Sequence, residues 1–191
     1  MRSAIGSLIF LACLAGCAVQ ASTKPVEYLD ERTAATVGAL KDPIEFMPTL
    51  GTAGADGRGK HVSYAYLGPV EWDKAGEYTY GLWVHVIGGS NWTPADIQSP
   101  SAVTMELDGE SIPLVPMPDP KLGREAYKQI ASWGQTGYFE LSVKMLQHMA
   151  ESRKLNLEVR GTDGGTATFI PVRDTHPVLD EFVHARSLTG D

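Results

Sequence analysis

Residues 102–114 read AVTMELDGESIPL, and this stretch decides the class of fold. Val103, Met105 and Leu107 alternate with more polar residues, which is the pattern of a strand with one buried face. Asp108 and Gly109 come next, and this pair readily takes the positive φ angles of a type I′ turn. The stretch therefore predicts a β-hairpin and, with it, an antiparallel sheet.

Strand patterns dominate the first two thirds of the chain. In residues 61–67, HVSYAYL, the large side chains Val62, Tyr64 and Tyr66 alternate with His61, Ser63 and Ala65. Residues 78–88, YTYGLWVHVIG, are apolar on both faces, as a central buried strand is. Glycine and proline separate these runs from their neighbours. Further strands are expected at residues 26–30, 33–40, 44–47, 125–132 and 136–140.

In the last third of the chain, the spacing of apolar residues includes helical patterns as well as strand patterns. Ser142 is a suitable N-cap, and Leu141 and Leu146 have the spacing of a hydrophobic staple around it, so a short helix is expected there. A second hairpin is predicted over residues 155–169, with its turn at Gly161 to Gly165. A closing helix follows, with four apolar residues on the side that faces the sheet: Val178, Leu179, Phe182 and Val183.

These elements define the expected fold class. It is mainly β with two short C-terminal helices (α+β), an antiparallel, β-sandwich-like single domain over residues 26–191. Apolar residues make up 43% of the chain and charged residues 20%, which is ordinary globular usage and argues against disorder. A chain of 191 residues is long enough to bury a sizeable core without a second domain.

The N-terminus has the pattern of a targeting signal. Met1 and Arg2 form a short positive region, and the small or apolar run from Ala4 to Leu14 is too short to span a bilayer but suits a signal peptide. The tetrapeptide Leu14-Ala15-Gly16-Cys17 then resembles the lipobox of bacterial lipoproteins. The alternative is an ordinary leader that is cleaved later, after Ala21.

The lipobox resemblance implies a chemical sequence. A diacylglycerol thioether forms on Cys17, the bond between Gly16 and Cys17 is cut, and the new amine is acylated, commonly with palmitate. Residues 1–16 are then the signal peptide, and residues 17–25 are the lipidated cysteine and a short tether. Ala18, not Asp, follows the cysteine, which in Gram-negative bacteria implies a lipid anchor in the outer membrane, with the domain on the periplasmic face.

Cysteine count and charge exclude several classes of function. Cys13 leaves with the leader and Cys17 carries lipid, so the folded part has no thiol for catalysis, redox chemistry or zinc. The formal charge is −7, and loss of Arg2 with the leader takes away one positive charge and gives −8. A field of that sign repels phosphate, so no nucleic acid partner is expected.

Catalytic and cofactor signatures are weak. The Gly-rich residues 51–59 lack the Lys-Ser/Thr of a phosphate loop, and Ser90 lacks the second glycine of a serine elbow. The five histidines show no metal-ligand spacing, and His85 is expected to be a half-buried side chain of a strand. We therefore expect no cofactor, no metal and no catalytic residue that the sequence can name.

Aromatic residues are the remaining binding candidates. Most should be core, but Trp72 and Trp92 lie in turn-rich stretches and are the two predicted to be available for binding. The favoured hypothesis is a non-catalytic lipoprotein that binds an envelope protein or supports envelope assembly. The first alternative is a module that binds polysaccharide or peptidoglycan through Trp72, Trp92 and nearby tyrosines. The second is a hydrolase that assembles carboxylates such as Asp73, Glu77 and Asp163.

Overall fold

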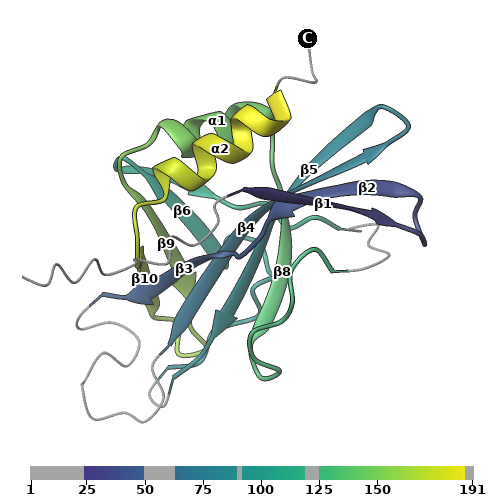
Figure 1. The fold of residues 1–191 in the computed structure, drawn as a ribbon. Coiled ribbons are helices and arrows are strands. Elements are labelled where there is room, and N and C mark those ends of the chain that lie inside the picture. Colours follow the sequence, from purple (N-terminus) through teal and green to yellow (C-terminus); the bar gives the residue numbers. More distant parts are fainter. Residues whose placement is uncertain (1–23, 50–62, 90–91, 119–124, 188–191) are drawn as a thin grey trace, which may run out of the picture.

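The computed structural model describes residues 24–49, 63–89, 92–118 and 125–187. Within these ranges the chain forms ten antiparallel strands and two helices (Figure 1), which confirms the mainly β, α+β fold class. The elements are β1 (Pro25–Asp30), β2 (Ala35–Leu40), β3 (Ile44–Pro48), β4 (Tyr64–Lys74), β5 (Glu77–Ile87), β6 (Val103–Leu107), β7 (Glu110–Pro113), β8 (Gln135–Glu140), α1 (Val143–Glu151), β9 (Leu155–Arg160), β10 (Thr166–Pro171) and α2 (His176–Ser187).

The predicted hairpin of residues 102–114 is confirmed as β6 and β7. Asp108 and Gly109 have φ angles of 49° and 94°, so the turn has the positive φ angles that the Asp-Gly pair favours. The Asp108 carboxylate also accepts the backbone N–H groups of Arg153 and Lys154, which join α1 to β9. The turn therefore fixes the hairpin and also holds the chain that leads into β9.

The strands form one continuous sheet that curls on itself. It runs in the order β1-β2-β4-β3-β10-β9-β6-β7, with β5 and β8 added on the other side of β4. Beyond β7 the chain reaches β8: Glu140 donates its N–H to the Val115 carbonyl, and Met117 donates its N–H to the Tyr138 carbonyl, both at 2.8 Å. The curled sheet is thus closed by hydrogen bonds between residues 115–117 and β8, instead of being two separate sheets.

Strand β4 divides the molecule into two parts. Residues Tyr64–Lys74 pair along one edge with β3 over the first half and with β2 over the second half. We call β1, β2 and the outer segments of β4 (70–74) and β5 (77–80) the arm, which projects to the right of the helices in Figure 1. The body consists of the other strands, the inner segments of β4 (64–69) and β5 (81–87), and the two helices.

The core fills the body. Phe46, Leu67, Val84 and Phe169 are fully buried, in line with the alternating patterns of their strands. The two helices lie side by side across one end of the curled sheet (Figure 1), and α2 also contacts β1 and β2. No helix among the described residues is long and apolar enough to cross a membrane.

Both helices were predicted, and the N-cap of α1 and the apolar side of α2 are confirmed. Ser142 is the N-cap of α1, and its side chain accepts the N–H of Met145 at 3.1 Å. In α2, Leu179 and Phe182 are fully buried, whereas Val178 and Val183 are partly buried against the core.

Two strand predictions need correction. Residues 125–132 form turns and irregular structure, not a strand, because Tyr127 anchors this segment by side-chain contacts instead of strand pairing. The Tyr127 ring lies against Gly68, where a Cβ would collide with it. The strand predicted at residues 61–67 extends much further than expected, since β4 continues through PVEWDK to Lys74.

Candidate functional site

A large concavity formed by described residues lies between the arm and the body. It is an open groove of about 1330 Å³. The β1–β2 turn, the outer β4–β5 hairpin, residues 112–118 and the start of α1 all line it. Glu140, where β8 ends, and the following Leu141 and Ser142 also line the groove. Its size and openness suit a segment of a macromolecule more than a small metabolite.

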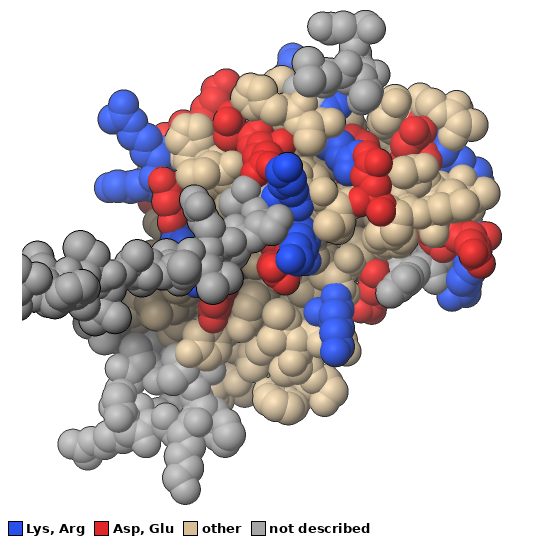
Figure 2. Space-filling view, in the orientation of Figure 1, with Lys and Arg blue, Asp and Glu red and all other residues tan. Residues whose placement is uncertain are grey.

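The groove has an apolar wall with charges at its rim. Exposed or half-exposed apolar side chains come from both sides, with Tyr78 from β5 and Val115 from the segment after β7. Arg32 and Lys74 lie at the arm side, and Glu77 and Glu140 lie along β5 and at the end of β8. Figure 2 shows basic and acidic side chains intermixed over the face of the molecule that it presents, with no extended patch of one sign.

Trp72, predicted to be available for binding, lines this groove but is buried. Its exposed fraction is 9%, because the ring packs against Tyr138 at 6.1 Å between centroids and covers Gly81. The prediction of an exposed ring was wrong since PVEWDK is part of a long strand and not a turn. Trp72 therefore contributes to the floor of the groove instead of offering a ring face to solvent.

Trp92 is also buried, with an exposed fraction of 7%. It forms an isolated bridge with Gly89 and packs edge-on against Phe169 at 5.8 Å, so its turn-rich sequence lies over the core. The exposed tryptophan is Trp133, at 74%, in the loop before β8. The sequence pattern did not separate these cases, because each of the three residues has a glycine within four positions of it.

A charged cluster, buried at Arg186 and Glu71 and exposed at Glu27, fastens the last turn of α2 to the arm. The Arg186 guanidinium donates to the carboxylate of Glu27 on β1 and lies 3.4 Å from the carboxylate of Glu71 on β4. Gly38 on β2 makes room for it, because a Cβ there would collide with the guanidinium. This cluster joins elements that are distant in sequence, and no local motif announces it.

Burial shifts the pKa values of two residues at this cluster, Glu71 and Tyr80. Burial raises the pKa of Glu71, and the nearby Arg186 charge opposes that rise. Tyr80 lies directly opposite Glu71 on β5, and burial together with the Glu71 charge raises the pKa of Tyr80 to about 12. The cluster joins α2 to the arm. Of its residues Glu27, Glu71, Tyr80 and Arg186, only Tyr80 lines the groove.

His85 lies in an aromatic layer on β5 and is fully buried, more so than the half-buried state predicted. Its ring is stacked on Trp83 at 5.6 Å, and Nδ1 is 2.8 Å from the Thr136 hydroxyl. Burial lowers the pKa of His85, so the neutral ring is favoured. Tyr127 continues the layer beyond Trp83. The histidine is thus part of a packed layer and does not line the groove.

The carboxylates considered for a hydrolase serve separate turns. Asp73 accepts the N–H of Gly76 in the β4–β5 turn, and Asp163 accepts the N–H of Gly165 in the β9–β10 turn. Figure 1 places these two turns at opposite ends of the molecule. Glu77 lies beside Asp73 in the arm, but Asp163 does not join them. Among the described residues, moreover, no group of three or more His, Cys, Asp and Glu side chains could hold a metal ion.

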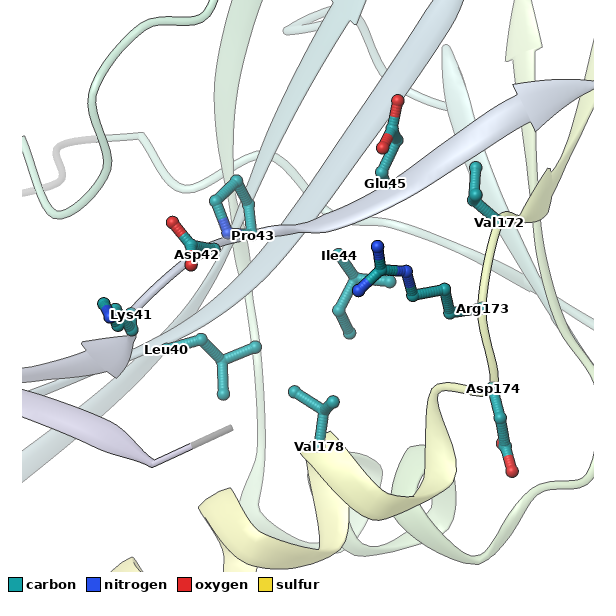
Figure 3. A pocket seen from close by; sticks show the side chains of 10 residues that line it. All are labelled: Leu40, Lys41, Asp42, Pro43, Ile44, Glu45, Val172, Arg173, Asp174 and Val178. Carbon is teal, nitrogen blue, oxygen red and sulfur yellow. The ribbon is translucent and has the colours of Figure 1, made fainter. Parts of the chain in front are cut away.

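A second, smaller cavity of about 260 Å³ lies between the β2–β3 bend and the segment from β10 to α2. Figure 3 shows that Val178 and Leu40 point into it, and that the Arg173 side chain extends over Ile44. Asp174 points away from the cavity in the same view. The lining is therefore apolar below and of mixed charge at the mouth, without a convergent set of polar groups.

The proposed lipidation and cleavage residues, Cys17 and Gly16, lie outside the described residues, as do the Gly-rich residues 51–59 and Ser90. Strand β1 begins at Pro25, the last residue of the predicted tether.

The fold and groove define a class, a small antiparallel β protein with a helix-capped body and a projecting arm. No family model matches this chain, and no curated protein or solved structure matches it.

Proposed function

We propose that the protein is a lipoprotein anchored in the outer membrane through Cys17, whose domain, on the periplasmic face, binds another envelope protein in the groove. The observation that carries this proposal is the groove itself, which is large and open, lies between two structural parts, and is lined by apolar side chains together with charged ones. The Leu14-Ala15-Gly16-Cys17 sequence supports the anchor. Two or three acyl chains bind a membrane far more strongly than one, so such an anchor is stable.

The anchor has its own test. Full-length chain with Cys17→Ser should lose metabolic palmitate labelling and move from the outer-membrane fraction to the soluble periplasmic fraction. Cys13→Ser is the matched control and should label and partition as the unaltered chain does. Absence of label from the unaltered chain, or membrane retention of the Cys17→Ser chain, contradicts the anchor.

The groove is tested by crosslinking in intact cells. A photoreactive p-benzoylphenylalanine is placed at Val115 in the groove or at Ile130 outside it, two sites with exposed fractions of 55% and 48%. We expect a discrete protein adduct from position 115 and none from position 130. Equal adducts from both positions, or none from either, would contradict a partner-binding groove.

A polysaccharide ligand is the second candidate, and the half-exposed Tyr78 ring in the groove favours it. Trp72 and Trp92 no longer support this alternative, because both are buried. If a soluble peptidoglycan fragment suppresses the position-115 adduct and binds the purified full-length chain, the polysaccharide function replaces the protein partner.

A further inference from the structure

We propose that the groove takes an extended segment of the partner polypeptide, which adds as a strand to β5, antiparallel to it and in line with β8. This inference rests on the proposed function and names how the partner binds. It starts from a break in the sheet: β8 pairs with β5 only between Gly81 and Val86, whereas β5 begins four residues earlier, at Glu77. Among the described residues, no strand pairs with the outer side of residues 77–80.

The backbone of this segment presents to the groove hydrogen-bonding groups that have no strand partner among the described residues. The hairpin turn at Ala75 and Gly76 has two residues with positive φ, so Lys74 and Glu77 form the hydrogen-bonded closing pair. Groups alternate along an antiparallel strand, and the N–H and C=O of Tyr78 and Tyr80 therefore point away from β4. They point to the side on which Leu82 pairs with Phe139 of β8. An added strand would continue that same ladder.

This edge lacks the protection found on the other edges of the sheet. Strand β1 begins with a proline, and its Glu27 is bound by Arg186, while β7 is short and ends in Pro113. The open segment of β5 reads EYTY, which contains three residues of high strand propensity and no proline. An unprotected edge of this composition beside an apolar groove is the arrangement that strand addition uses.

Charge selects among extended segments. Glu77 and Glu140 stand at the two ends of the open edge with exposed side chains, whereas the basic Arg32 and Lys74 lie on the arm side of the groove. The whole chain is acidic as well, with a formal charge of −7. We therefore commit to a partner segment with apolar side chains flanked by lysine or arginine, because acidic ends attract a basic segment and repel an acidic one.

The test uses the crosslinker at Val115 in the full-length chain, in cells. Tyr78→Pro removes one outward N–H without touching the bonds to β4, and proline is tolerated on an edge strand. Tyr78→Val is the matched control that removes the ring but keeps the N–H. We expect the adduct to fall about tenfold with Tyr78→Pro and to persist with Tyr78→Val. Peptide mapping should place the crosslink in a segment flanked by lysine or arginine.

A second variant guards against misfolding of the proline chain. Glu77→Lys combined with Glu140→Lys changes only exposed side chains, and should also lower the adduct yield severalfold. An adduct that survives both Tyr78→Pro and the double charge reversal overturns strand addition but leaves a partner-binding groove standing. Loss of the adduct with Tyr78→Val as well as Tyr78→Pro assigns binding to the ring and also overturns strand addition. Absence of any adduct from the unaltered chain removes both proposals.

Discussion

The body and the arm are held by different kinds of interaction. The interior of the body is apolar and its sheet closes on itself, with Phe46, Leu67 and Phe169 fully buried. The arm continues the same sheet, but its attachment to α2 depends on the buried Arg186 and its carboxylate partners. The comparison teaches that apolar alternation alone produces the closed part, whereas the arm combines buried apolar side chains such as Val37 and Trp72 with a charged cluster and leaves one edge open.

The largest expected effect is in the body. Phe182→Ala removes a fully buried ring from α2 and should lower the free energy of unfolding by about 4 kcal/mol. Val183→Ala, on the same helix but only partly buried, should lower it by about 1 kcal/mol. Both are measured by denaturant unfolding of the full-length chain with Cys17→Ser. An unchanged midpoint with Phe182→Ala would mean that α2 is not part of the body.

A somewhat smaller effect is expected where α2 meets the arm. Arg186→Met leaves the buried Glu71 carboxylate without its cation and should cost about 3 kcal/mol. Adding Glu71→Gln to that variant removes the unpaired charge and should recover most of the loss. If the double variant is no more stable than Arg186→Met alone, the two side chains are not coupled and the account of the arm is wrong.

Tyr127 links the arm to the body, and its substitution should have a moderate effect on the free energy of unfolding. Its hydroxyl accepts the N–H of Leu40 at 2.9 Å and donates to the Pro69 carbonyl at 2.8 Å. Tyr127→Phe keeps the ring but leaves two buried backbone groups unpaired, which should cost about 2 kcal/mol in unfolding free energy. Tyr28→Phe is a suitable control, since the Tyr28 hydroxyl makes an exposed contact with the Glu125 carbonyl. Equal losses from both variants would contradict the anchoring role of Tyr127.

The smallest expected effect is a change in how steeply the free energy of unfolding depends on pH. Because burial raises the pKa of Glu71, the folded chain binds its proton more tightly than the unfolded chain does. The stability that Glu71 contributes is therefore present below its unfolded pKa and lost as pH rises through the folded pKa. Glu71→Gln should become more stable relative to the unaltered chain as pH rises from about 4.5. If the difference in unfolding free energy between Glu71→Gln and the unaltered chain stays constant with pH, Glu71 does not have a raised pKa in the folded chain.

Local sequence rules predicted the body well. The Asp108-Gly109 turn, the Ser142 cap and the apolar side of α2 each depend on a few adjacent residues, and the structure has all of them. The same rules failed for Tyr127, whose segment looks like a strand but is fixed by contacts to Leu40 and Pro69 far away in sequence.

The groove could not be predicted from the sequence, because it depends on where β8 leaves the sheet and on how far β4 extends. Trp72 illustrates this limit. Its neighbours Pro69, Asp73 and Gly76 suggested a turn, but pairing with β2 and β5 makes residues 69–74 a strand and buries the ring. A signal was present in the alternation of Val70 and Trp72, which continues the pattern of Tyr64 and Tyr66.

Amide hydrogen exchange resolved by residue tests most directly whether the arm has an open edge. The measurement follows Tyr78, Thr79, Tyr80 and Leu82 in the full-length chain with Cys17→Ser. We predict fast exchange at Tyr78 and Tyr80, whose N–H groups have no strand partner among the described residues, and slow exchange at Thr79 and Leu82, which pair with β4 and β8. Protection of Tyr78 and Tyr80 equal to that of Leu82 would contradict the account, because the edge would then already be occupied.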